Sequence, residues 1–375
     1  MNRQTISLGR ILNIPIGLDY SWFLVFALLT WTLATVYFPA EFRNWSTGQY
    51  WIVGAATAIL MFASVLLHEL GHSVIAMRYK IPVRSITLFI FGGVAQIASE
   101  PPSAGAEFWI AIAGPVVSFA LAIFFGLLQP VVGAVAPLLA LAKYLAYING
   151  TLALFNLIPG FPLDGGRVFR AIVWGVTRNL RRATLIAANL GRLIAFLFIL
   201  FGAWQIVTGN LSNGLWIAFI GWFLESAASS QLQHQVLHDS LAGHQVSDMM
   251  SRNYTLIPAE TTLQQLVDLH ILGSGQRSFV ITQGDRVIGL LTPQRIRETP
   301  SDAWPVTSVA QAMLPAAQVK PIQPDEELWT AWEEMSTDGV NQLPVMADGR
   351  LLGILSRDDI IGFLRARREL GVTSP

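Results

Sequence analysis

The sequence contains six long apolar segments, and they constrain the fold more than any other feature. A helix that spans a bilayer needs about 20 predominantly apolar residues. Hydrophobic residues make up 53% of the chain and charged residues only 13%, against about 45–50% and 25% in soluble domains. We therefore expect a polytopic α-helical membrane domain over residues 1–230. The candidate spans are residues 20–38, 51–77, 107–128, 136–158, 193–208 and 215–228.

Basic residues gather in alternate loops between these segments. Arg3 and Arg10 precede the first span, and three basic residues follow the second. The loop after the fourth span contains Arg167, Arg170, Arg178, Arg181 and Arg182. The opposite side carries Arg43 and, near its end of the fourth span, Lys143. Cytoplasmic loops carry an excess of Lys and Arg. Six spans therefore predict a multi-pass protein of the cell membrane with both termini in the cytoplasm.

The segment between the second and third spans, residues 81–102, is apolar but does not read as a helix. Its run IPVRSITLFIFGGVAQI favours strands and contains a glycine pair. Irregular backbone can lie at membrane depth only where protein or a water-filled cavity satisfies its polar groups. We therefore expect a strand-like, re-entrant segment that lines a site.

A metal-binding pattern lies within the second span, in the run VLLHELGHSVI. His68 and His72 are four residues apart, so they share a helix face and can bind one tetrahedral zinc. Glu69 lies beside that face, as a general base would. A charged group costs about 2.5–3.5 kcal/mol at the centre of a spanning helix, whereas structural zinc sites return about 10–16 kcal/mol. Zinc binding therefore explains these residues better than polar packing between helices.

A third ligand is needed, because a catalytic zinc usually has three protein ligands and one open position. The chain has no cysteine, so the ligand must be His, Asp or Glu. Asp164 is the best candidate, in NLIPGFPLDGGRVFRA, where prolines break the helix and Gly165 and Gly166 allow a tight turn. The alternative is an ordinary helix end capped by Asp164. The HELGH run favours the metal ligand.

A repeat of roughly sixty residues follows the last apolar segment, where charged residues return. VSDMM aligns with VAQAM, and SFVITQGDRVIGLLTPQRI with LPVMADGRLLGILSRDDI. Each copy reads as helix, strand, turn, strand, helix. This pattern resembles a tandem pair of CBS domains, a cytosolic α/β module that commonly binds adenine nucleotides. The expected parts are a linker at 231–243, a first CBS domain at 244–300 and a second at 306–367.

The predicted membrane domain resembles a site-2 protease. The similarity rests on HELGH in one span, the GG-containing segment after it, and N-x-x-P-x-x-P-L-D-G-G in a later span. It implies an intramembrane zinc metalloendopeptidase that hydrolyses a peptide bond in or near the transmembrane segment of a membrane protein, as in regulated intramembrane proteolysis. It also implies that His68, His72 and Asp164 bind one zinc ion. Glu69 would activate water, and Asn156 would help to hold the substrate or the oxyanion.

The substrate of such an enzyme must present extended backbone, because the peptide bonds of a helix are shielded by their own hydrogen bonds. We expect the edge from Phe91 to Ile97 to pair with the unwound substrate as an added strand.

The resemblance to CBS domains also implies nucleotide-binding residues. Ser356 and Asp359 fit the S/T-x-x-D pattern with which that family holds a ribose. The first copy has Thr292, but Arg295 replaces the aspartate, so at most one of two nucleotide sites is complete. A bound adenine nucleotide would modulate the protease. The alternative is that the pair only dimerises, and we expect a homodimer through the CBS domains in either case.

Other classes of function fit the sequence less well. Net charge is zero and Lys and Arg form no basic face, so we expect no nucleic-acid partner. A CBS-regulated metal transporter would carry polar residues along a pathway and often a repeat of its spans, and the sequence has neither. A catalytically inactive relative that binds membrane proteins is the third reading, and the intact HELGH and LDG motifs argue against it.

Overall fold

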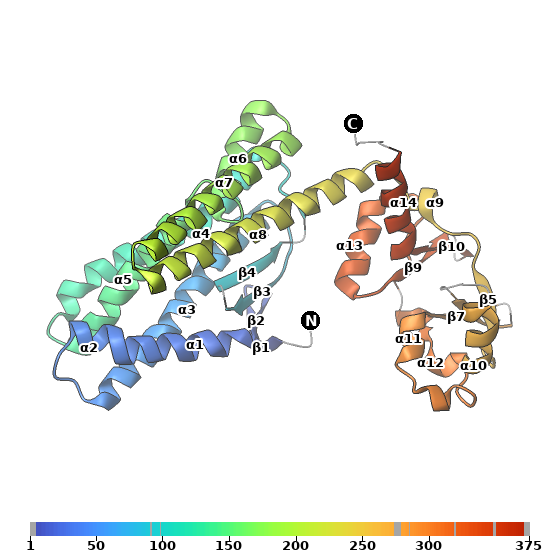
Figure 1. Ribbon diagram of the computed structural model, residues 1–375, viewed down its shortest axis with the longest axis horizontal. Helices are drawn as coiled ribbons and strands as arrows, with labels where there is room; N and C mark the ends of the chain where they lie inside the picture. Colours follow the sequence, from blue (N-terminus) through green and yellow to red (C-terminus); the bar gives the residue numbers. More distant parts are fainter. Residues whose placement is uncertain are drawn as a thin grey trace. The chain divides into compact units, whose positions relative to one another are not determined.

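The computed structural model describes residues 5–90, 92–97, 99–273, 279–284, 286–318, 320–347 and 350–370. The chain forms two compact units, Met1–Gln235 and Val236–Pro375. The first is a bundle of long helices with a small sheet, and the second is a mixed α/β unit (Figure 1).

Five helical segments among the described residues are long and apolar enough to cross a membrane. They correspond to the first five predicted spans, although the fifth begins at residue 180 instead of 193. The first, Ser21–Glu41, combines α1 (Ser21–Thr32), the π-helical η1 (Leu33–Tyr37) and α2 (Phe38–Glu41). The others are α3 (Thr47–Arg78), α4 (Ala104–Val132), α5 (Ala136–Asn156) and α7 (Leu180–Val207).

The predicted sixth span lies within a longer helix, α8 (Leu211–Leu241). This helix is not among the five that meet the criterion of length and apolar composition. Glu225 and the serines that follow it lower the mean hydropathy of the apolar segment. The helix also continues through most of the predicted linker, residues 231–243.

The strand-like prediction for the segment after the second span is confirmed, because it forms a hairpin of β3 (Val83–Phe89) and β4 (Gly92–Ile97). Two strands from the N-terminus complete the sheet: β1 (Thr5–Ile11) and β2 (Ile14–Asp19). The order is β1-β2-β3-β4, with β2 and β3 parallel and the other pairs antiparallel. Strand β4 is therefore an edge of the sheet.

The sheet packs on the helix that carries the HELGH run. Buried side chains of β2 and β3, including Ile16 and Ile86, form one cluster with Leu70 of α3. Apolar packing of this kind fixes the sheet against the helix because it removes both surfaces from a polar environment. The sheet therefore lies against α3 (Figure 1) and contacts it at Leu70, in the middle of the HELGH run.

A buried ion pair joins α4 to the short helix α6 (Asp164–Thr177). Glu107 of α4 is fully buried, and Arg170 of α6 donates from its Nε to Glu107 Oε1 at 2.6 Å. The Arg170 guanidinium also lies over the ring of Phe161, 5.4 Å from its centroid. Breaking a buried pair by removing one partner leaves an uncompensated charge, which costs about 3–5 kcal/mol. This pair therefore holds α6 firmly on α4.

The second unit contains two copies of the predicted strand-and-helix pattern. Strands β5, β6, β7 and β8 form one sheet in that order, and β9 pairs with β10 in another. The elements of the first copy are α9 (Val246–Met249), β5 (Thr255–Pro258), α10 (Leu263–Leu266), η2 (Val267–Leu272), β6 (Phe279–Gln283), β7 (Arg286–Leu291), α11 (Pro293–Arg297) and η3 (Ser301–Ala303). Those of the second are α12 (Val309–Ala312), β8 (Leu314–Pro315), η4 (Ala316–Gln318), α13 (Leu328–Asp338), β9 (Gln342–Ala347), β10 (Arg350–Ser356) and α14 (Arg357–Glu369).

Candidate metal centre

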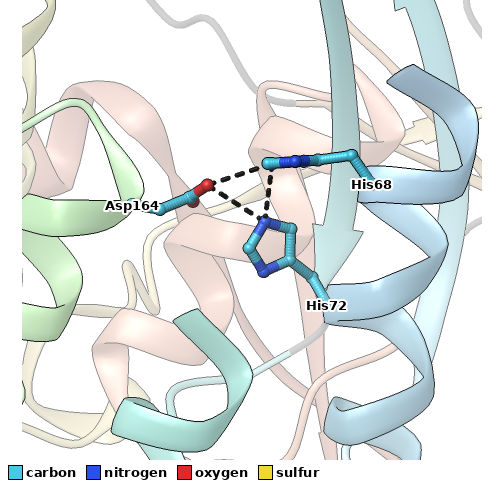
Figure 2. Close-up of side chains that lie close together, drawn as sticks. All are labelled: His68, His72 and Asp164. Carbon is cyan, nitrogen blue, oxygen red and sulfur yellow. Dashed lines mark hydrogen bonds and ion pairs between the residues drawn. The ribbon is translucent and has the colours of Figure 1, made fainter. Parts of the chain in front are cut away.

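Helix α3 places the two histidines on one face, one turn apart. Both side chains are buried, and their Nε2 atoms lie 3.2 Å from each other (Figure 2). The helix is continuous from Thr47 to Arg78 because Ser46 and Gln49 form a capping box at its start and no proline interrupts it. The i, i+4 spacing therefore places the two imidazoles side by side, with their Nε2 atoms adjacent.

Asp164 is the first residue of α6, and its carboxylate faces the two imidazoles (Figure 2). The N-cap of this helix is Leu163, and it has no side-chain capping bond. Asp164 Oδ2 instead lies 3.1 Å from His68 Nε2 and 3.2 Å from His72 Nε2. The capping alternative thus fails at this residue, since the carboxylate is directed across the bundle.

Glycines let the backbone around Asp164 pack closely enough to hold that position. A Cβ on Gly165 would lie 2.4 Å from the carbonyl oxygens of Leu157 and Ile158. A Cβ on Gly191 of α7 would lie 2.3 Å from the carbonyl oxygen of Phe161. No side chain fits in such spaces, so these glycines allow the broken stretch between α5 and α6 to fold tightly against α7.

The three ligand atoms fit one zinc ion. Zinc–nitrogen and zinc–oxygen bonds of about 2.0–2.2 Å in a tetrahedron place neighbouring ligand atoms about 3.3 Å apart. The observed separations among His68 Nε2, His72 Nε2 and Asp164 Oδ2 are 3.1, 3.2 and 3.2 Å. This is also the one cluster of metal-ligating side chains found within the described ranges. The donor set, two imidazoles and a carboxylate, is one that catalytic zinc sites use.

Helix α4 supplies contacts that the sequence reasoning missed. Ser118 Oγ lies 2.8 Å from His68 Nδ1, and the Ile110 carbonyl oxygen lies 2.7 Å from His72 Nδ1. Between them, a Cβ on Gly114 would lie 2.2 Å from His72 Nε2 and 2.6 Å from His68 Nε2. The spacing of four among Ile110, Gly114 and Ser118, matching that of the histidines, is the signal that could have indicated this helix face.

Glu69 lies between the histidines and the edge of the sheet. Its carboxylate accepts a hydrogen bond from the backbone of Ala95 in β4 and interacts electrostatically with the three ligands. A Cβ on Gly93 would lie 2.5 Å from Glu69 Cγ. Gly93 therefore lets the edge strand approach the Glu69 side chain, as expected for a segment that lines the site. Phe91, the first residue of the predicted edge, lies outside the described residues.

Asn156 is the last residue of α5 and is partly exposed. The structure gives no contact between its side chain and the three ligands, and its proposed contact with substrate remains a prediction.

The second unit contains a cavity of about 670 Å³ between the two copies of the repeat. Thr292 and Ser356 line it, together with Asn341 and Asp358, whereas Asp359 is not among its lining residues. The Asp359 carboxylate instead accepts hydrogen bonds from the backbone N–H and the hydroxyl of Ser356, at 2.9 and 2.6 Å. The predicted ribose-binding pair is thus engaged in capping α14.

Two buried imidazoles and a partly buried carboxylate, with a second carboxylate beside them in a bundle of apolar helices, define a membrane-embedded zinc hydrolase. The comparisons with known proteins agree. The model of Peptidase family M50 matches residues 56–138 and 133–200, and that of the CBS domain matches 246–302 and 309–366.

Two relatives resemble the chain over nearly its whole length. Rip3 of Mycobacterium tuberculosis and sll0528 of Synechocystis, both named as zinc metalloproteases, are each 34% identical over 96% of this chain, which is 92% and 96% of their own length. A solved site-2 protease from Methanocaldococcus jannaschii is 31% identical, covering 60% of this chain and 94% of that one, with a TM-score of 0.43. The chain belongs to the M50 family of site-2-type zinc metalloproteases. It is a multi-pass membrane protein with a tandem CBS pair.

The position of Gly114 leads to a prediction about metal content. Replacing Gly114 with Ala places a methyl group against both ligand nitrogens, so we expect bound zinc to fall at least about tenfold. Gly126→Ala is the matched control, since it lies on the same helix and its Cβ would meet nothing within 4 Å. Zinc per chain is measured by mass spectrometry on purified protein. Equal zinc in both variants would show that Gly114 does not shape the site.

Proposed function

We propose that this protein hydrolyses a peptide bond in or near the transmembrane segment of a membrane-protein substrate, in regulated intramembrane proteolysis. The observation that carries the proposal is the triangle of His68, His72 and Asp164 ligand atoms, at 3.1–3.2 Å, beside Glu69 in a helix of membrane-spanning composition. Zinc, when bound there, supplies a Lewis acid and lowers the pKa of its water toward about 7.

The residues around that position have separate tasks. Glu69 takes the proton of the attacking water and delivers it to the leaving amine nitrogen as the peptide bond breaks. Asn156 donates its amide N–H to the developing oxyanion of the tetrahedral intermediate. The short connection from Asn156 to Asp164 is held in place by the glycines at 165 and 191, which supports a fixed relation between the amide and the metal ligand.

Substrate backbone is proposed to bind along the outer edge of β4. That strand is the last of its sheet, and its Ala95 backbone reaches the Glu69 carboxylate. A peptide added there as a further strand would run past the catalytic carboxylate with its backbone extended and its peptide bonds accessible. The hydrogen bonds that the substrate loses on unwinding would be replaced by bonds to the strand edge.

We extend the proposal to location and regulation. The basic loops favour the cell membrane with both termini in the cytoplasm, which requires α8 to cross the bilayer as a sixth span. The cavity of about 670 Å³ is large enough for an adenine nucleotide. We propose that a nucleotide bound there modulates proteolysis, and that the CBS pairs of two chains form a homodimer.

The catalytic proposal is tested with Glu69→Gln, which keeps the shape of the side chain but removes its basicity. We expect cleavage of a single-span substrate in liposomes to fall at least about 100-fold, with zinc content unchanged. Wild type and Glu69→Gln cleaving at equal rates would disprove the assigned role. Zinc passing through the vesicle membrane without any cleavage would indicate a transporter.

The strand-edge proposal is tested by crosslinking, since the chain has no native cysteine. Val94→Cys, in a Glu69→Gln background, is expected to form a disulfide with single-cysteine substrates at alternate positions around the cut. Val94 is 47% exposed, and Val116→Cys on α4, where the side chain is 56% exposed, is the control. Crosslinking that is no stronger at Val94 than at Val116, or that shows no two-residue period, would contradict strand addition.

The nucleotide proposal is tested with a pair of matched cap variants. Ser356→Ala removes a helix cap and a hydroxyl that lines the cavity, whereas Ser308→Ala removes only the cap of α12. We expect AMP, ADP or ATP to bind Ser356→Ala about tenfold more weakly, in line with the loss of one hydrogen bond, and Ser308→Ala as wild type. Calorimetry with the full chain measures both. If none of the three nucleotides binds wild type, the proposal is wrong.

A further inference from the structure

The Nδ1 atoms of His68 and His72 contact two different kinds of group on α4. His72 Nδ1 lies 2.7 Å from the backbone carbonyl oxygen of Ile110, and His68 Nδ1 lies 2.8 Å from the side-chain hydroxyl of Ser118. All four residues are buried. Each contact engages the imidazole nitrogen that does not face Asp164.

A hydrogen bond to one imidazole nitrogen determines how the other nitrogen can bind a metal. A carbonyl oxygen can only accept, so His72 Nδ1 carries the proton and Nε2 keeps its lone pair. A hydroxyl that accepts from His68 Nδ1 has the same effect on that ring. In both cases the Nε2 lone pair points toward Asp164 Oδ2, which lies 3.1–3.2 Å away.

The geometry of α4 allows both contacts at once. Residues 110, 114 and 118 are spaced by four, so they share one helix face, and that face lies along the two histidines of α3. Gly114 in the middle leaves room for the Nε2 atoms. Close approach of the two helices is also possible at Gly71, where a Cβ would lie 2.9 Å from Val117 Cγ2. Helix α4 therefore lines the metal site together with α3.

We propose that Ser118 is a positioning residue that fixes the ring of His68 for zinc, while the Ile110 carbonyl does the same for His72. Ser118 touches neither substrate nor metal and acts only through the imidazole. Of the two partners, only Ser118 can be altered by substitution without changing the backbone. The inference rests on the proposed function, because it assumes that zinc occupies the triad.

The test uses the full chain in detergent and measures the zinc dissociation constant by competition with a chelator. Ser118→Ala is expected to bind zinc about 10–100-fold more weakly, as for other lost partners of ligating histidines. Ser118→Thr keeps the hydroxyl and should recover most of the affinity. Ser73→Ala is the control, because that buried hydroxyl bonds only the Glu69 carbonyl oxygen, at 2.8 Å, and should leave zinc affinity unchanged.

Two further measurements distinguish a positioning role of Ser118 from a general loss of stability. Melting temperatures measured without zinc should be the same for Ser118→Ala and Ser73→Ala, whereas the visible spectrum of the cobalt-substituted protein should change only in Ser118→Ala. Equal zinc affinity in these two variants would overturn the inference, as would a loss in Ser118→Thr equal to that in Ser118→Ala. Wild type that does not bind zinc would overturn the proposed function itself.

Discussion

The structure depends on enclosing two imidazoles and two carboxylates among helices that are mostly apolar. Each such group is costly at membrane depth, and only a shared interaction can offset the cost. In this protein the offset is concentrated at one point, where three ligand atoms lie 3.1–3.2 Å from each other. Much of the surrounding architecture serves to bring α3, α6 and α4 to that point.

Close backbone packing and one buried ion pair meet this requirement. Glycines occupy positions 93, 114, 165 and 191, where the chain passes within contact distance of another backbone, of a histidine Nε2 atom or of the Glu69 side chain. The Glu107–Arg170 pair ties α6, which begins with Asp164, to α4, which carries Ser118. Moving either helix would therefore disturb Asp164 and the partner of His68 together.

Much of this site could be predicted from the sequence because its strongest elements are local. The i, i+4 histidines need only a continuous helix, and Asp164 stands out beside prolines and glycines in an apolar setting. The contacts of Ser118 and Ile110 with the histidines could not be predicted in this way. The two residues lie about forty to fifty positions from those histidines, in a segment whose composition indicates only a membrane span. The strands of the hairpin were expected, but their pairing with an N-terminal hairpin is a long-range contact that strand propensity does not reveal. In the second unit the repeat predicted the pattern of elements, whereas the bonds of Asp359 to Ser356 depend on where α14 begins.

The central claim is that His68, His72 and Asp164 hold one zinc ion within the membrane domain. X-ray absorption at the zinc edge of the purified full chain tests it most directly. The account predicts a first shell of nitrogen and oxygen atoms at about 2.0–2.2 Å, with the outer-shell scattering of two imidazoles, and loss of one imidazole in His68→Ala. Zinc that is absent from wild type, or bound without imidazole scattering, would contradict it.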